Sequence, residues 1–367
     1  MNPIIKMLEG VKVQWRPLGE VATYEQPTKY LVKSSNYNDE FKTPVLTAGK
    51  TFVLGYTDEA TGIYKASESS VIIFDDFTTA NKWVDFDFKV KSSAMKLITS
   101  SDENIILKKY IYYWLNTLPE ELNDTNHKRQ WISNFANKLI PIPPLAIQEK
   151  IVGILDKFTE LTAELTAELT ARKKQYTYYR DKLLTFGNEV QWSPLGEVCG
   201  LITTGKLNAN KMDGEGIYPF FTCNENPYWI NSFAFDLEAI LISGNGSQVG
   251  HINYYKGKFN AYQRTYVIGE CKNISIMYLY HYLKCYLKGY ILVNSRTGSI
   301  PYITLPMLEN FNIPIPPLAI QEKIVGILDK FDALTNSITE GLPKEIKLRE
   351  QQYVYYRNLL LSFSESE

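Results

Sequence analysis

The chain has 367 residues, enough for two or three domains, and its 22% charged and 45% hydrophobic residues are ordinary for a globular protein. These values exclude wholesale disorder, and no apolar run approaches the roughly 18 residues of a membrane-spanning helix. The formal net charge of −1 neither indicates nor excludes a nucleic-acid partner, because local patches decide such binding. Four cysteines without a C-x-x-C pair predict reduced thiols in a cytoplasmic protein rather than a disulfide framework or a zinc site.

In chain order, the first feature is a short box, Val13–Val21, that reads V-Q-W-R-P-L-G-E-V and returns with one substitution at Val190–Val198. We call it the opening box. A variable part follows each copy, so the chain is a tandem duplication of one unit.

Each variable part predicts a mixture of strands and helix. The short apolar runs Val71–Phe74 and Ile240–Ser243 predict buried strands. The longer stretches Ile105–Leu115 and Ile276–Tyr290 predict helices. Each variable part is therefore expected to be an α+β domain.

A helical segment closes each unit. Pro141–Phe158 returns without substitution as Pro314–Phe331. Its prolines predict an extended lead into the first helical turn, and apolar residues then recur at steps of four and three, the pattern of a coiled-coil seam. The residues that we expect to form the helix pair, or to dock partner subunits, are Gln148, Ile151, Ile154, Phe158, Gln321, Ile324, Ile327 and Phe331.

The two helical regions differ in length. The opening box and the hexapeptide Gln175–Arg180 return after 177 residues, but the proline segment returns after 173, so we expect the second helix to be four residues longer. The first helix also contains the four-residue repeat Thr162–Leu169. This repeat is either a tolerant spacer or an adjustable ruler, since four residues add about 6 Å and about 40° of rotation.

The predicted fold class is therefore α+β, with two globular recognition domains in a pseudo-two-fold arrangement, separated by a pair of long antiparallel coiled-coil helices. Two independent helices, each capping its own domain, are the alternative. The predicted segments are a first domain with its opening box (1–143), a helical spacer (144–187), a second domain (188–316) and a second helical spacer (317–367).

This organisation resembles the specificity subunit of type I restriction-modification systems over essentially the whole chain. The most specific features are P-x-P-P-L-x-x-Q-x-x-I-x-x-x-L at each helix start and the paired W-x-P-L-G-E-V boxes. Tyr218–Thr222, Ile240–Gly246 and Gly257–Arg264 look typical of a target recognition domain of that family. The first domain departs from this pattern, with Asp75–Asn81 where the second has Gly244–Gly250.

The resemblance implies a non-catalytic subunit that reads a bipartite, asymmetric target in double-stranded DNA. It also implies two copies of a methyltransferase subunit, docked on the identical helical segments, together with restriction subunits. S-adenosylmethionine, ATP and Mg would then be bound by those partners and not by this chain.

Polar and basic residues on the expected loops are the candidates for DNA contact. Arginine suits guanine edges, asparagine and glutamine suit adenine edges, and lysine suits phosphates. In the second domain the candidates are Lys206, Asn208, Asn210, Lys211, Asn245, Ser247, Gln248, Gln263, Arg264, Asn294, Arg296 and Thr297. In the first domain they are Thr78, Thr79, Asn81, Lys82, Lys91, Ser92, Lys128 and Arg129.

No catalytic or metal-binding constellation is predicted. The chain has no G-x-x-x-x-G-K-[ST] phosphate loop, and its three histidines are scattered. The main alternative function is a protein-only scaffold or decoy that keeps the docking helices but has lost DNA recognition. The near-neutral charge and the divergent first domain leave this alternative open.

Overall fold

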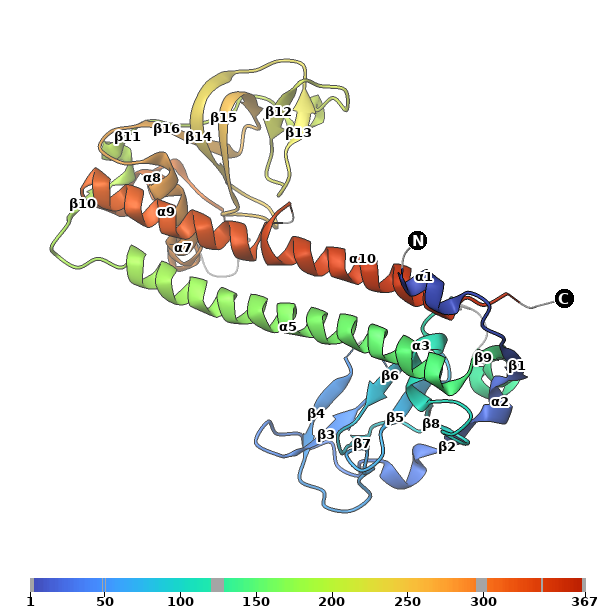
Figure 1. Ribbon diagram of the computed structural model, residues 1–367. Coiled ribbons are helices and arrows are strands. Elements are labelled where there is room, and N and C mark those ends of the chain that lie inside the picture. The colour runs from blue at the N-terminus through green and yellow to red at the C-terminus, as the bar shows by residue number, and fades with distance from the viewer. Residues whose placement is uncertain are drawn as a thin grey trace. The chain divides into compact units, whose positions relative to one another are not determined.

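The computed structural model describes residues 3–47, 49, 51–119, 129–294, 302–337 and 339–364. Its contacts divide the chain into two compact units, one made of Met1–Leu165 with Ile346–Glu367 and the other of Thr166–Glu345. Each unit combines one globular head with segments of two helices that are far apart in the sequence (Figure 1). The units therefore cut across the four predicted segments, because each helical region contributes to both.

The first head contains a four-stranded and a three-stranded sheet. The order of the four-stranded sheet is β2 (Ala22–Glu25), β8 (Met95–Ser100), β5 (Val71–Asp75), β6 (Asn81–Val84), and that of the other is β4 (Val53–Thr57), β3 (Thr43–Leu46), β7 (Lys89–Val90). Because side chains alternate along a strand, Ile72 and Phe74 enter the core shared with helix α3 (Lys108–Leu115), whereas Val71 and Ile73 enter the core on the other face.

The second head repeats this plan in one six-stranded sheet. Its order is β11 (Cys199–Thr204), β16 (Thr265–Cys271), β14 (Phe235–Ser243), β15 (Ile252–Ala261), β12 (Tyr218–Phe221), β13 (Tyr228–Ile230). Ile240 and Ile242 pack in the core with helix α7 (Ile276–Asn294), and Ala239 and Leu241 line the opposite face. The order β11-β16-β14-β15 matches β2-β8-β5-β6, so the two heads share one fold and both predicted strand runs are confirmed.

Two of the four cysteines form a disulfide in the second head. Cys199 and Cys271 lie directly opposite each other in the antiparallel pair of β11 and β16. Cys223 and Cys285 are free thiols. The prediction that all four would be reduced was wrong for this pair, because 72 residues separate the two cysteines and only strand pairing brings them together.

Each opening box forms a strand that pairs with the last strand of its own head. Strand β1 (Gln14–Pro17) pairs antiparallel with β9 (Leu139–Ile142), and β10 (Gln191–Pro194) pairs in the same way with β17 (Asn312–Ile315). Each box ends in a short helix, α2 (Leu18–Val21) or α6 (Leu195–Val198). The remaining short helices are α1 (Pro3–Leu8), α4 (Gln130–Ser133) and α8 (Leu305–Glu309). Each head thus begins and ends in one two-stranded ladder.

The two helical regions differ in continuity as well as in length. Helix α5 (Leu145–Leu184) is a single helix of 40 residues, about 60 Å long. The second region is two helices, α9 (Leu318–Thr335) and α10 (Gly341–Leu361). The prediction of one longer helix was therefore wrong, since the four extra residues fall at a break. Gly341 has a φ of 72°, and a Cβ there would lie 2.4 Å from the Ala333 carbonyl oxygen, so this position requires glycine.

Within each unit the two helix segments pack on one another. In the first unit the Phe158 ring of α5 stacks on Tyr356 of α10, with centroids 5.5 Å apart. In the second unit Tyr176 and Tyr179 of α5 lie 6.0 and 5.8 Å from the Phe331 ring of α9. The paired segments run in opposite directions (Figure 1), as predicted.

Candidate functional site

The glutamine of each proline box fastens a helix to its own head. The Gln148 Oε1 accepts a hydrogen bond from Leu107 N at 2.9 Å, and its Nε2 donates to the carbonyl oxygens of Ile105 and Pro143 at 3.0 and 2.8 Å. Gln321 makes the same three bonds, to Ser275 N, Asn273 O and Pro316 O. Both glutamines are fully buried.

Two further contacts occur in both units, one and two turns further along the head helices α3 and α7. The Tyr110 hydroxyl donates to Pro141 O, and the Tyr278 hydroxyl donates to Pro314 O. Next, Tyr113 bonds the Asp156 carboxylate in the first unit. In the second unit the buried His281 takes its place, with Nε2 2.7 Å from Asp329 Oδ1. Each head helix is thereby held on the helix that follows its head.

These contacts change the role of several predicted docking residues. Gln148, Gln321, Ile151 and Ile324 are buried inside their own units, so their side chains cannot contact a partner subunit without unfolding. Phe158 and Phe331 form the helix pair, as predicted. Ile154 packs against the first core, and Ile327 is half-buried on α9.

The same helices carry an exposed face that is identical in the two units. Its residues recur at steps of three and four and share one helix side. They are Ala146, Glu149, Lys150, Gly153 and Lys157 on α5, and Ala319, Glu322, Lys323, Gly326 and Lys330 on α9. We call these two sets the repeated helix faces. Tyr178 near the end of α5 and Tyr355 near the end of α10 are also equivalent, and each is 60% exposed.

In each head, three chain segments meet at one residue, and we call these meeting points the loop junctions. In the first head, Asp76 N donates to Ala94 O, and Asp76 O accepts from Gln130 N. In the second head, Gly244 N donates to Arg264 O, and Gly244 O accepts from Ile303 N. In each head the loop after the central strand (β5 or β14) is thus bonded to the turn before the neighbouring strand β8 or β16. It is also bonded to a segment that follows the head helix (α3 or α7).

The first junction contains a buried ion pair. The Asp76 carboxylate accepts a hydrogen bond from Trp131 N at 2.8 Å and lies 3.4 Å from Lys96 Nζ. Both charged side chains are only 1% exposed. Because a buried charge without a partner is costly, this pair holds the loop of the first head firmly in place.

The predicted DNA-contact residues of the first head gather around its junction. Thr78, Lys82, Lys91, Ser92 and Arg129 are exposed, on or beside the three segments that Asp76 connects. Asn81 is half-buried, and its Oδ1 accepts from Asn116 Nδ2. Thr79 has a φ of 61° and is only 6% exposed, so little of its side chain is open to contact. Lys128 lies outside the described residues.

The candidates of the second head gather in the same way. Asn245, Ser247 and Gln248 follow the junction residue, and Gln263 and Arg264 form the turn bonded to it. The loop with Lys206, Asn208, Asn210 and Lys211 joins them, because Gln263 N donates to Leu207 O. Asn294 is exposed at the end of α7. Arg296 and Thr297 lie outside the described residues.

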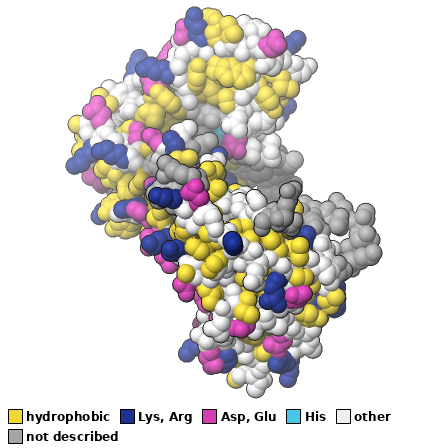
Figure 2. Space-filling model, turned by 45° about the vertical axis from the view of Figure 1, so that its right-hand side comes forward, with side chains coloured by type: hydrophobic (Ala, Val, Ile, Leu, Met, Phe, Trp, Pro, Cys, Tyr) yellow, Lys and Arg dark blue, Asp and Glu magenta, His cyan; other side chains and the backbone are white. Residues whose placement is uncertain are grey.

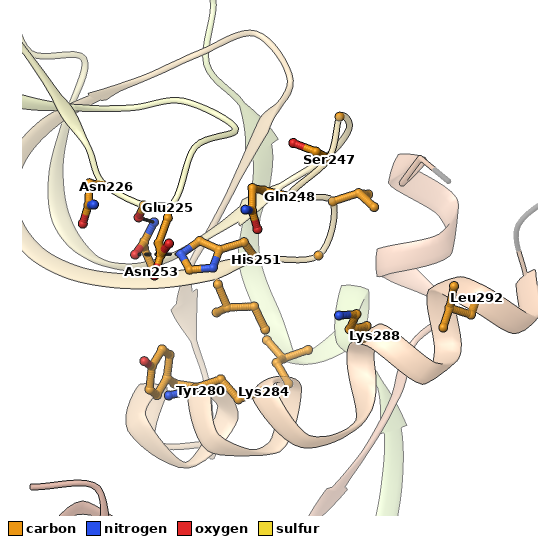
Figure 3. Close-up of a pocket in the computed structure, with 15 residues that line it drawn as sticks. Glu225, Asn226, Ser247, Gln248, His251, Asn253, Tyr280, Lys284, Lys288 and Leu292 are labelled. Carbon is orange, nitrogen blue, oxygen red and sulfur yellow. Dashed lines mark hydrogen bonds between the residues drawn. The ribbon is translucent and has the colours of Figure 1, made fainter. Parts of the chain in front are cut away.

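A groove of about 720 Å³, with a mixed polar and apolar lining, lies beside the second junction, between the loop at residues 246–253 and helix α7 (Figure 3). Gln248 points from the loop toward α7, and Lys288 points from α7 toward the loop. His251 Nε2 lies 3.3 Å from Asn253 Oδ1, and Asn253 Nδ2 donates to Glu225 O.

Sequence reasoning missed most of this lining. Lys284 and Lys288 lie one turn apart on α7 and face the groove, a spacing that could have been read from the predicted helix. His251 directly precedes strand β15, and Asn253 lies near its start; nothing in the sequence distinguishes them from other residues of this region.

The surface charge is mixed. On the face shown in Figure 2, Lys and Arg side chains lie among Asp and Glu side chains rather than in one basic patch. Among the described residues, no group of three His, Cys, Asp or Glu side chains is placed to hold a metal ion. In the same part of the chain, no helix is both long and apolar enough to cross a membrane.

Comparison with known proteins identifies the class. The family profile of the type I restriction modification DNA specificity domain matches residues 10–172 and 188–348. These two stretches make up most of the chain, so the protein belongs to this family.

Relatives and solved structures agree with this assignment. The chain is 49% identical, over 100% of its length and 98% of the relative, to the EcoR124I/EcoR124II specificity subunit of Escherichia coli. It is 33% identical to a putative type I specificity subunit of Haemophilus influenzae, with 98% of both chains covered. The fold is similar to the crystal structure of the type I S subunit from M. genitalium, with a TM-score of 0.69 and 18% identity over the whole of both chains.

Proposed function

We propose that this chain is the non-catalytic specificity subunit of a type I restriction-modification complex, in which each head reads one half of a split DNA target. The observation that carries the proposal is that the heads share one fold and one loop junction but present different residues there. One fold with two reading surfaces fits an asymmetric, two-part site.

The repeated helix faces support the assembly part of the proposal. Two identical exposed faces suit two copies of one partner, and we infer that each docks a methyltransferase subunit, with restriction subunits joining the complex. Methylation and ATP-dependent chemistry, with S-adenosylmethionine, ATP and Mg, would belong to those partners.

DNA recognition is tested on the complex of this chain with its own methyltransferase subunit. Methylated sites are mapped in cells that carry the complex, and binding to duplex DNA is measured against salt concentration. We expect one split motif and a steep loss of affinity with salt, since phosphate contacts release counterions. A stable complex that methylates no motif and does not bind duplex DNA even at low salt would instead favour the protein-only scaffold, with which the mixed charge of the face in Figure 2 is compatible.

The docking part is tested by reversing charge on both repeated helix faces with Lys150→Glu and Lys323→Glu, two equivalent exposed residues. The matched control is Lys173→Glu, an exposed lysine on α5 outside these faces. We expect the double variant to keep its melting temperature but to lose the methyltransferase subunit in size-exclusion chromatography. Equal retention of that subunit by the double variant and the control would show that docking occurs elsewhere.

A further inference from the structure

The groove of the second head has a counterpart in the first. A groove of about 360 Å³ is lined by Thr79–Lys82, by Leu115 at the end of α3 with Asn116, Leu118 and Pro119 after it, by Phe135, and by Arg357 of α10, which belongs to the same unit. In both heads the groove therefore lies beside the loop after the central strand and the start of the next strand. Its other wall is α7 in the second head, and the end of α3 with the residues after it in the first.

The two grooves are equivalent in position but not in lining. The central strand is β5 in one head and β14 in the other. Their neighbours in the sheet are equivalent, with β8 and β6 beside β5 and with β16 and β15 beside β14. Six residues separate the paired partners Phe74 and Asn81, whereas nine separate Ile242 and Ile252. The longer loop presents Gln248, while the first groove presents Asn81 and Lys82 in its place.

The loop of the second groove is held rigidly. Ser243 N donates to His251 O, and Gly250 N donates to Ser243 O at 2.8 Å. Gly250 has a φ of 79°, a conformation that favours glycine, and a Cβ there would lie 2.9 Å from Ile291 Cδ1 of α7, so a larger residue would strain the loop and displace the end of the Ile291 side chain. The loop therefore needs little further ordering on binding.

Gln248 is available to a ligand. Its side chain is exposed, and in the described part of the chain its carboxamide has no hydrogen-bond partner. A glutamine carboxamide matches the N6 donor and N7 acceptor of adenine in the major groove. Lys288, exposed on the opposite wall, suits a phosphate.

We propose that these equivalent grooves are the base-reading sites of the two heads, and that Gln248 reads an adenine in the half-site of the second head. The inference rests on the proposed DNA-binding function and narrows it. Among the exposed polar loop residues, those that face the grooves specify sequence, and the others only position the DNA.

The test uses the whole chain with its methyltransferase subunit and maps the methylated motif. With Gln248→Ala we expect one A·T pair of one half-site to become degenerate, with about a 10- to 100-fold loss of discrimination. Lys82 lines the first groove, and lysine can also donate to guanine O6 and N7, so with Lys82→Ala only the other half-site should change. With Lys288→Ala binding should weaken at all sequences, and the slope of log affinity against log salt should fall by about one.

The matched control is Gln191→Ala, an exposed glutamine of β10 in the same unit that does not line the groove; its motif should be unchanged. If Gln248→Ala is unstable, Gln248→Glu keeps the shape and should exchange adenine for cytosine, since a carboxylate only accepts hydrogen bonds. A wild-type complex with a split motif that both Gln248 variants leave intact, or change in both halves, would overturn the groove assignment alone. A wild-type complex without a motif would overturn the DNA-reading function itself.

Discussion

The buried side chains of Gln148 and Gln321 each satisfy three backbone groups. Replacing Gln148 by leucine keeps most of the volume but leaves Leu107 N, Ile105 O and Pro143 O unpaired. Because each unpaired buried group costs about 1–3 kcal/mol, we expect the free energy of unfolding of the first unit to fall by several kcal/mol. Chemical denaturation measures this loss.

The exposed neighbour Lys150 provides the control. Lys150→Leu should change the free energy of unfolding by less than about 0.5 kcal/mol. An equally small effect of Gln148→Leu would show that water replaces the three bonds, and that the motif glutamine has another role.

His281 makes the stability of the second unit depend on pH. Burial lowers the pKa of His281, and the neighbouring Asp329 offsets only part of this effect. The unfolded chain therefore takes up a proton at a higher pH than the folded chain does, so stability is full above the unfolded pKa of about 6.5 and is lost as the pH falls below it.

The first unit supplies the matched variant, because Tyr113 occupies the equivalent position and bonds Asp156. Between pH 7.5 and 5.5 the melting temperature should fall less in His281→Tyr than in the unaltered chain, because the second unit then lacks this buried histidine. An unchanged pH profile in the variant would place the sensitivity at other groups.

Among the helical elements, the repeat Thr162–Leu169 lies wholly inside the unbroken α5. Deleting Thr166–Leu169 should shorten α5 by about 6 Å and turn its far end by about 40°. One base pair of DNA advances 3.4 Å and turns about 35°, so the rotation matches one base pair, whereas the rise alone matches between one and two.

Rotation should decide, because a head turned to the wrong groove face loses its base contacts, whereas a few ångströms are absorbed by bending. We expect both half-site sequences to persist and the gap between them to change by one base pair, as read from the methylated sites. Full activity with the original gap would make the repeat a spacer only.

At the same scale, repetition explains which elements could be predicted. Apolar periodicity predicted the helices, and the duplication predicted their antiparallel pairing, because two like units related by a two-fold axis place their helices in opposite directions. The break before α10 also has a signal in the sequence, because Gly341-Leu342-Pro343 is a helix-stopping combination. The apolar helical pattern on both sides of these residues nevertheless predicts a single helix. The loop junctions and the Cys199–Cys271 disulfide depend on strand pairing across long separations, which periodicity does not reveal.

At the scale of the whole molecule, the two-stranded ladders predict that heads are exchangeable. The segment Ala22–Leu139 begins after the first opening box and ends where β9 starts, so replacing it with a foreign recognition domain leaves the core of the ladder and both helices native. We expect one half-site of the methylated motif to change and the other to stay. A hybrid that altered both halves would mean that the heads do not read independently.

The break between α9 and α10 has a consequence for how such a chain can vary over time. Helix α5 pairs with α10 in one unit and with α9 in the other, so any insertion between its two paired stretches must be matched on the opposite side. On that side α9 and α10 are joined by a short loop rather than by continuous helix. Because a loop can change its conformation to span a different distance, no compensating insertion is needed there. A single duplication of four residues in α5 can be inherited without a second, simultaneous mutation, and target spacing can evolve in steps while both reading heads stay unchanged.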